Sequence, residues 1–328
     1  MMWNRRSVSV TTMIMVGALA VAPTQSNLPV STSPDGAIRL VGRMRVARAA
    51  ATATTIAGNR VLIAGGMREG GDALREYEVF DATTNRVVAS GEMDDSRSGH
   101  SATRLSDGRV LILGGYNGSY LKSAVIFDPR TSRFVPAGSM NVGRSGHTAT
   151  LLGDGTVLIT GGVGDGWLFL ASAEVYDPRT DKFTPVKSMS VARESHTATL
   201  LRDGRVLITG GHRDRRENIV VYASTELYDP GERQFSAGPM LTQARHKHDA
   251  AALADGRVLV LGGSDPRDRT RFTSAEVYDP TANRWSAVSR MRIARYKLRD
   301  TALRLRDGRI LIAGSGRFAE FVPCDAHP

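Results

Sequence analysis

An internal repeat of about fifty residues limits the folds that are open to this chain. The stretches at 144–162 and 193–211 read RSGHTATLLGDGTVLITGG and RESHTATLLRDGRVLITGG. Related copies occupy 97–115 and 245–263, and weaker ones occupy 48–66 and 297–315. A repeat of this length forms one structural unit, and neighbouring units stack to bury a continuous core. The sequence therefore predicts six similar units.

Each unit contains the pattern of four β-strands. The alternation in HTATLL predicts a first strand, and the apolar run in RVLILGG predicts a second strand that is buried on both faces. Asp-Gly pairs beginning at 107, 154, 203, 255 and 307 predict tight turns between these two strands. A third strand is predicted over 124–129, 173–178, 225–230 and 275–280. A short fourth strand ends at Met93, Met140, Met189, Met240 or Met291.

The details of the repeat resemble those of kelch repeats. They are the paired glycines, the Tyr-Asp-Pro that ends the third strand, and an aromatic residue six positions after its Asp: Phe134, Phe183, Phe235 and Trp285. The resemblance extends from residue 37 to about 323. It implies an all-β fold, a six-bladed β-propeller over 37–328.

The two ends of the repeat region predict how the ring closes. The last copy has three predicted strands, whereas AIRLVGRM at 37–44 resembles the fourth strand RFVPAGSM at 133–140. We expect this N-terminal strand to complete the last blade, because closure removes the exposed sheet edges.

The first 22 residues have the pattern of a signal peptide, and 23–36 would form a linker to the propeller. MMWNRR is basic, the following run is apolar but too short to span a membrane comfortably, and small residues end it. We expect a secreted or periplasmic protein with no membrane span after cleavage. The only cysteine is Cys324, so an intramolecular disulfide is excluded.

A net charge of +10 raises the question of nucleic-acid binding. The charge is scattered along the chain rather than clustered, and export argues against such a partner, so we expect none.

Every unit begins with a basic residue, and the kelch resemblance implies that these residues lie near the mouth of the central channel. The set is Arg48, Arg97, Arg144, Arg193, Arg245 and Lys297, with Arg295 competing for the last position. Six cations around one opening would suit an anionic ligand. The alternative is structural, with the cations paired between blades to the third-strand glutamates: Glu78, Glu174, Glu226, Glu276 and Glu320.

Histidines stand three residues after four of these arginines, at His100, His147, His196 and His248. We interpret them as buried, hydrogen-bonded residues, because equivalent positions in neighbouring blades are too far apart to share a metal ion. No metal or other cofactor is expected.

The loops after the double glycines differ from one unit to the next, and the resemblance places them on the same face as the arginines. They carry aromatic residues among arginines, a combination that suits sugar rings, acidic glycans or an acidic peptide. The alternative is ordinary solvated loops. The candidate ligand-binding residues here are Tyr116, Tyr120, Trp167, Arg215 and Arg269.

These features predict a monomeric recognition module that binds glycans or protein partners through the loop face. Enzymatic activity is the less favoured interpretation, since no nucleophile, phosphate-binding loop or other catalytic set is legible. A copper oxidase of the galactose-oxidase kind would need a cross-linked cysteine, and Cys324 lies beyond the last predicted strand. The alternative function is a mutarotase or epimerase that acts on an anionic sugar such as sialic acid. A purely structural envelope protein is a third possibility.

Overall fold

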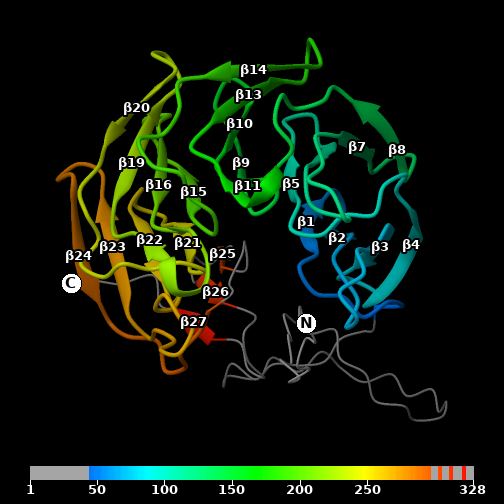
Figure 1. Ribbon diagram of the computed structural model, residues 1–328. Coiled ribbons are helices and arrows are strands. Elements are labelled where there is room, and N and C mark those ends of the chain that lie inside the picture. Colours follow the sequence, from blue (N-terminus) through cyan, green and yellow to red (C-terminus); the bar gives the residue numbers. More distant parts are fainter. Residues whose placement is uncertain (1–43, 297–301, 305–309, 313–319, 323–328) are drawn as a thin grey trace, which may run out of the picture.

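The computed structural model describes residues 44–296, 302–304, 310–312 and 320–322. Within them the chain forms five four-stranded antiparallel sheets and one three-stranded sheet, which follow one another around a central axis (Figure 1). The fold is therefore the expected all-β, six-bladed propeller. The strand expected at 37–44 falls almost wholly outside the described residues, and so does the closure that we assigned to it.

Each blade is one repeat, and its strands are hydrogen-bonded to their neighbours in sequence order. The strands of blades 1 and 2 are β1 (Thr52–Ile56), β2 (Arg60–Ala64), β3 (Glu76–Asp81), β4 (Arg86–Glu92), β5 (Ser101–Arg104), β6 (Val110–Leu113), β7 (Ala124–Asp128) and β8 (Arg133–Ala137). Those of blades 3 and 4 are β9 (Thr148–Leu151), β10 (Val157–Thr160), β13 (Ala173–Asp177), β14 (Lys182–Val186), β15 (Thr197–Leu200), β16 (Val206–Thr209), β19 (Thr225–Asp229) and β20 (Gln234–Ala237). Those of blades 5 and 6 are β21 (Asp249–Ala252), β22 (Val258–Leu261), β23 (Ala275–Asp279), β24 (Arg284–Val288), β25 (Ala302–Arg304), β26 (Ile310–Ile312) and β27 (Glu320–Val322).

In the five four-stranded blades the first strand lies innermost and the fourth lies on the outside (Figure 1). Successive first strands contact one another around the axis, from β1 to β5, β9, β15, β21 and β25. The core lies between the blades rather than inside any one of them. In β6, Val110 and Ile112 pack with blade 1, whereas Leu111 and Leu113 pack with blade 3. The second strand must therefore be apolar at every position, as its sequence predicted.

The turns have the conformations that their sequences favour. In blade 2 the N–H of Gly108 donates to the carbonyl of Leu105 and the φ of Gly108 is 87°, a conformation that glycine adopts at low cost. The repeated aromatic residue packs across the outer hairpin, where Tyr176 and Phe183 are register partners with ring centroids 4.6 Å apart. The third and fourth strands are thereby joined by side chains as well as by backbone bonds.

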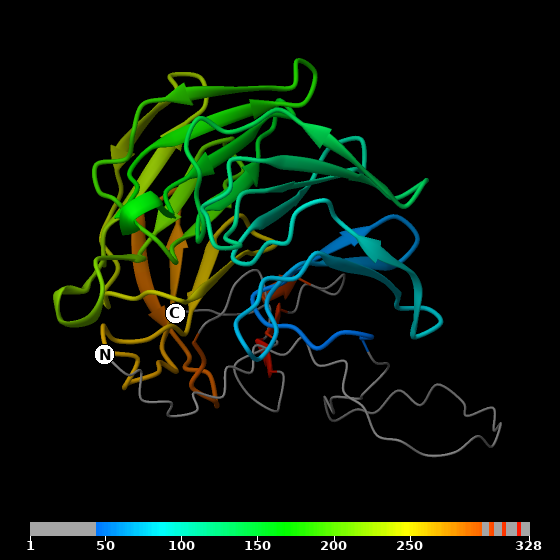
Figure 2. The ribbon, with the colours of Figure 1, turned by 45° about the vertical axis from the view of Figure 1, so that its right-hand side comes forward.

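The loops of blades 3 and 4 contain small additional elements. Blade 3 adds β11 (Val163–Gly164), the 3-10 turn η1 (Asp165–Trp167) and β12 (Leu168–Phe169). Blade 4 adds β17 (His212–Arg213), the 3-10 turn η2 (Arg216–Asn218) and β18 (Val220–Val221). In Figure 2 the short η1 helix stands at the end of the green blade. These two small hairpins distinguish blades 3 and 4 from the other described blades.

Candidate functional site

The repeat-starting arginines are enclosed within the blades. Arg97, Arg144, Arg193 and Arg245 are 0% exposed, and Arg48 is also buried. Arg144 donates from Nη1 to the carbonyls of Gly161 and Ser172, and from Nη2 to Oε1 of Glu174 at 2.8 Å. Burial lowers the pKa of Arg144, and the charge of Glu174 opposes that shift. The guanidinium thus joins the repeat start to the second and third strands of its own blade.

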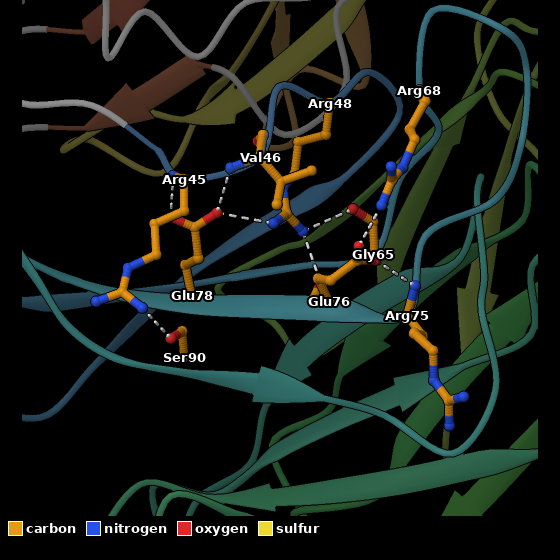
Figure 3. Close-up of polar contacts among 9 residues, drawn as sticks. All are labelled: Arg45, Val46, Arg48, Gly65, Arg68, Arg75, Glu76, Glu78 and Ser90. Atoms are coloured by element: carbon orange, nitrogen blue, oxygen red, sulfur yellow. Dashed lines mark hydrogen bonds and ion pairs between the residues drawn. The ribbon is translucent and has the colours of Figure 1, made fainter.

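The third-strand glutamate completes this connection. In blade 1, Nη2 of Arg48 contacts Oε1 of Glu78 at 2.8 Å, and the same carboxylate accepts the backbone N–H groups of Arg45 and Val46 (Figure 3). Glu174, Glu226 and Glu276 accept backbone N–H groups in the same way. Each glutamate therefore holds the connection that enters its blade. The expected Arg–Glu ion pairs are present, but each one joins two residues of the same repeat instead of two blades.

Blade 2 departs from this pattern, and in blade 6 the arginine position is not held by the predicted Lys297. Val125 occupies the glutamate position of blade 2, and Arg97 contacts Asp95 and Ser123 instead. In blade 6 the arginine position belongs to Arg295, which is 0% exposed and whose carbonyl accepts the N–H of Gly263, as the carbonyl of Arg144 accepts that of Gly115. Lys297 lies outside the described residues.

The double glycine is required by contact with the next blade. A Cβ atom on Gly114 would meet the carbonyl oxygen of Arg144 at 2.5 Å and Cε1 of His147 at 2.7 Å, and the φ of Gly114 is 64°. The four repeated histidines are buried, and each bonds through Nε2 to a hydroxyl on the first strand of the preceding blade, as His147 does to Ser101 at 2.9 Å. The expected role in buried hydrogen bonds is confirmed for these histidines.

Backbone hydrogen bonds also join the blades at the mouth. Among the residues two positions after the arginines, Gly99, Gly146, Ser195 and Lys247 each donate their N–H to the carbonyl of the counterpart in the preceding blade, and the series begins at the carbonyl of Ala50. All five residues have positive φ. The residues at the repeated positions thus pack and hydrogen-bond mainly with one another. Their side chains therefore offer little surface to a ligand.

The variable positions lie beside this ring. The residue after each arginine pairs by a β-bridge with the residue after the double glycine, and the pairs are Ala49 with Met67, Ser98 with Tyr116, Ser145 with Val163, Glu194 with His212, and His246 with Ser264. The register is the same in five blades, whereas the side chains differ in each. This face is therefore symmetric in its backbone and asymmetric in its chemistry.

One side of this surface is a cluster of three aromatic rings, of which Tyr116 and Trp167 are exposed and Tyr120 is half-buried. The rings of Tyr116 and Tyr120 have centroids 5.0 Å apart, and those of Tyr120 and Trp167 are 6.2 Å apart. Trp167 is 57% exposed and has a φ of 65°, an uncommon conformation for a residue with a side chain. The guanidinium of Arg215 lies 4.1 Å from the centre of the Trp167 ring. The loops of blades 2, 3 and 4 thus bring four of the five loop candidates together.

The other side is a row of titratable side chains that contact one another. Glu194 contacts Arg215 at 3.2 Å and Nε2 of His212 at 3.6 Å. The two Nδ1 atoms of His212 and His246 are 3.1 Å apart. Asp268 accepts from His246, from Lys247 at 2.5 Å and from Ser264. The row of titratable side chains thus begins at Glu194, the carboxylate that Arg215 contacts.

Burial and neighbouring charges set the protonation states of these side chains. Burial lowers the pKa of His212 to about 3, and the positive charges of Lys247 and Arg215 add to this shift. Burial alone would raise the pKa of Asp268, but its bonds from His246, Lys247 and Ser264 hold it well below the usual range. At neutral pH His212 is therefore uncharged and Asp268 is a carboxylate.

The fifth loop candidate lies apart from this cluster. The side chain of Arg269 is exposed, and its backbone N–H donates to Asp265. Glu194, His212, His246 and Asp268 are not among the residues predicted from the sequence. The signal was present for two of them, since Glu194 and His246 stand where other repeats have serine or alanine.

The described part of the chain contains neither a candidate metal site nor a candidate membrane-spanning helix. No group of three or more His, Cys, Asp or Glu residues there is placed to hold a metal ion. No helix in that part is long and apolar enough to cross a membrane.

Comparison with known proteins agrees with the repeat structure. Three stretches of the chain, residues 96–141, 143–190 and 250–292, match the Kelch motif. The chain therefore contains kelch repeats.

Two solved structures share its fold. The structure of YjhT superposes with a TM-score of 0.62 at 16% identity, over 74% of this chain and 84% of that chain. A fungal alcohol oxidase of the AA5 family, in complex with copper, superposes with a TM-score of 0.56 at 16% identity, over 82% of this chain and 70% of that chain.

Proposed function

We propose that this protein is an exported recognition module whose loop face binds a glycan or a protein partner. The observation that carries the proposal is the aromatic cluster of Tyr116, Tyr120 and Trp167 with Arg215 beside it. The repeat-starting arginines are left out of the proposed surface, because they are enclosed and hydrogen-bonded within the blades.

The chemistry of this aromatic cluster supports recognition. Trp, Tyr and Arg dominate binding energy at protein interfaces, since they bury much area and still make polar contacts. The same rings can pack against the flat face of a sugar while Arg215 binds an acidic group. Trp167 and Leu168 are 57% and 64% exposed at the tip of the blade 3 loop, so this apolar surface is available to a partner.

The fold itself does not choose between binding and catalysis. Propellers carry both activities, and the copper-bound oxidase that superposes on this chain is an enzyme. We therefore infer recognition from the loop face alone.

Binding can be tested with a panel of neutral sugars, acidic sugars, anionic glycans and acidic peptides. We expect acidic members to change the fluorescence of Trp167 in the full chain, and we expect Trp167→Ala and Tyr120→Ala to weaken their binding by tenfold or more. Val135→Ala is the matched control, because Val135 is 47% exposed on the outer strand β8. If no panel member binds, or if all three variants bind equally, the loop face is not the recognition surface.

One observation favours a mutarotase or epimerase of an anionic sugar as a second candidate. Glu194 places a carboxylate beside Arg215 and His212 at the mouth, where a sugar acid bound to Arg215 would meet a proton acceptor. The test is the rate at which the anomers of sialic acid interconvert, followed by NMR. Acceleration by the wild-type chain that is lost in Glu194→Gln would establish the activity, and an unchanged rate would exclude it for that sugar.

A further inference from the structure

Four side chains from two blades form one continuous series of polar contacts beneath the loop face. It runs from Glu194 to His212, across the pair of Nδ1 atoms to His246, and on to Asp268. His212 and His246 are 5% and 0% exposed, whereas Glu194 and Asp268 reach the surface at the two ends. The histidines are 34 residues apart in sequence and are brought together by the adjacency of blades 4 and 5.

The positions of the protons follow from the acceptors around the rings. Nε2 of His246 faces the carbonyl of Asp265 at 3.1 Å and the carboxylate of Asp268 at 3.3 Å, so it must carry a proton. In a neutral ring, Nδ1 of His246 is then the acceptor and Nδ1 of His212 is the donor. Nε2 of neutral His212 is left with a lone pair.

That lone pair points toward a carboxylate. Nε2 of His212 and Oε2 of Glu194 are 3.6 Å apart, and neither atom carries a proton when His212 is neutral and Glu194 is ionised. Two facing acceptors repel each other unless a positive charge or a proton lies nearby. Here Arg215 supplies the positive charge, since its Nη2 contacts the same Oε2 atom at 3.2 Å. Arg215 and a proton are therefore alternative ways to stabilise this contact.

We propose that the ligand of the loop face presents a carboxylate to Arg215, and that its binding is linked to the uptake of one proton between Glu194 and His212. This inference rests on the proposed recognition function. A second carboxylate on the same guanidinium shares its charge with Glu194 and adds a negative charge nearby. Both effects raise the affinity of the Glu194–His212 contact for a proton. Carboxylate binding should therefore tighten as the pH falls.

The neighbouring charges are consistent with this linkage. The charged groups that face the histidine pair are Glu194 and Lys247 from the repeat starts, Arg215 from the blade 4 loop and Asp268 from the blade 5 loop, where Asp265 contributes its backbone carbonyl. Lys247 and Asp268 pair with each other. Arg215 is thus the cation in this set that both contacts Glu194 and is exposed enough to meet a ligand.

The linkage has a test that needs no ligand. We expect NMR of labelled histidine side chains to show His212 protonated on Nδ1 and neutral at pH 6. In Arg215→Ala, the midpoint for proton uptake at His212 or Glu194 should rise by at least about one pH unit, because a neighbouring cation has been removed. Arg213→Ala is the matched control, since Arg213 is exposed and pairs with Asp214. Titration curves that coincide in wild type and Arg215→Ala would overturn the inference.

A second measurement tests the ligand itself. D-Glucuronate and D-glucose are titrated calorimetrically in two buffers of different ionisation enthalpy, which gives the number of protons taken up on binding. We expect wild type to bind glucuronate with net proton uptake, and Glu194→Gln to bind it with none, because the amide can donate to His212 without an added proton. Glucuronate binding without proton uptake in wild type would overturn the linkage and leave the recognition function intact. If no sugar, glycan or peptide of the panel changes the fluorescence of Trp167, the recognition function is contradicted. The titration of Arg215→Ala would still test the proton site in that case.

Discussion

Arg144 and Arg179 are both ion-paired, but only one of the two pairs is buried. Arg144 and Glu174 have side chains that are 0% and 2% exposed, whereas Arg179 is 74% exposed beside Asp177. A buried charge that loses its partner cannot recover its hydration. An exposed one is already solvated and contributes little through its pair.

Replacing Arg144 by alanine should therefore lower the free energy of unfolding by about 3–5 kcal/mol, since it leaves Glu174 buried without its cation. Arg179→Ala should be indistinguishable from wild type. Urea unfolding followed by circular dichroism measures both. Equal effects in the two variants would contradict the structural role assigned to the repeat-starting arginines.

The double glycine is a second requirement that can be traced to single atoms. Gly114→Ala should destabilise the protein by at least about 1–3 kcal/mol, because the new methyl group meets the Arg144 carbonyl in a backbone conformation that disfavours side chains. At Gly153 a new methyl group would have nothing within 4 Å, and φ is not positive. Gly153→Ala should leave the stability unchanged or raise it by up to about 1 kcal/mol. Thermal unfolding of the two variants measures whether stability falls in Gly114→Ala and stays the same or rises in Gly153→Ala.

At the scale of the elements, the histidine links between first strands make stability depend on pH. His248 is buried and bonded to Thr197 of the preceding blade, and burial lowers its pKa well below the usual value. Below about pH 6.5 the unfolded chain binds more protons at this residue than the folded chain, so stability falls as the pH falls. The slope is up to about 1.4 kcal/mol per pH unit for one such histidine.

We expect the free energy of unfolding to decrease from pH 6.5 to pH 5 in wild type and to decrease less steeply in His248→Asn. The comparison concerns slopes, so a general loss of stability in the variant does not affect it. Parallel slopes would show that His248 is not neutral in the folded blade. The range stays above the usual pKa of Asp and Glu, which would otherwise dominate the result.

The elements were largely predictable from sequence, and the site only in part. The strands, turns and six units could be predicted because every blade repeats the same local pattern. The burial of the arginines could not be decided, since a repeated cation fits a ligand ring as well as an internal pair. The contact between His212 and His246 depends on the packing of two blades, so no local pattern contains it.

At the scale of the whole molecule, closure of the ring remains a prediction. Deleting residues 37–44 should leave blades 1 and 6 with exposed edges, and hydrogen exchange should then quicken in β1–β4 and β25–β27 before it does in blades 3 and 4. Uniform exchange in all blades, at the wild-type rate, would show that another segment closes the ring.

The repeated positions hold the propeller together, and we propose that the variable positions on one face bind its partner. Arg193 and Arg215 test this division within a single blade, because Arg193 is 0% exposed and bonded to Glu226 whereas the side chain of Arg215 is 45% exposed over Trp167. The most direct measurement is the melting temperature of Arg193→Ala and Arg215→Ala with and without the acidic sugars of the panel. Arg193→Ala should melt several degrees lower, at about 2–4 °C for each kcal/mol lost, and should keep the ligand-induced rise. Arg215→Ala should melt like wild type and lose that rise. The opposite result, with ligand stabilisation lost in Arg193→Ala and kept in Arg215→Ala, would return the binding site to the repeat-starting arginines.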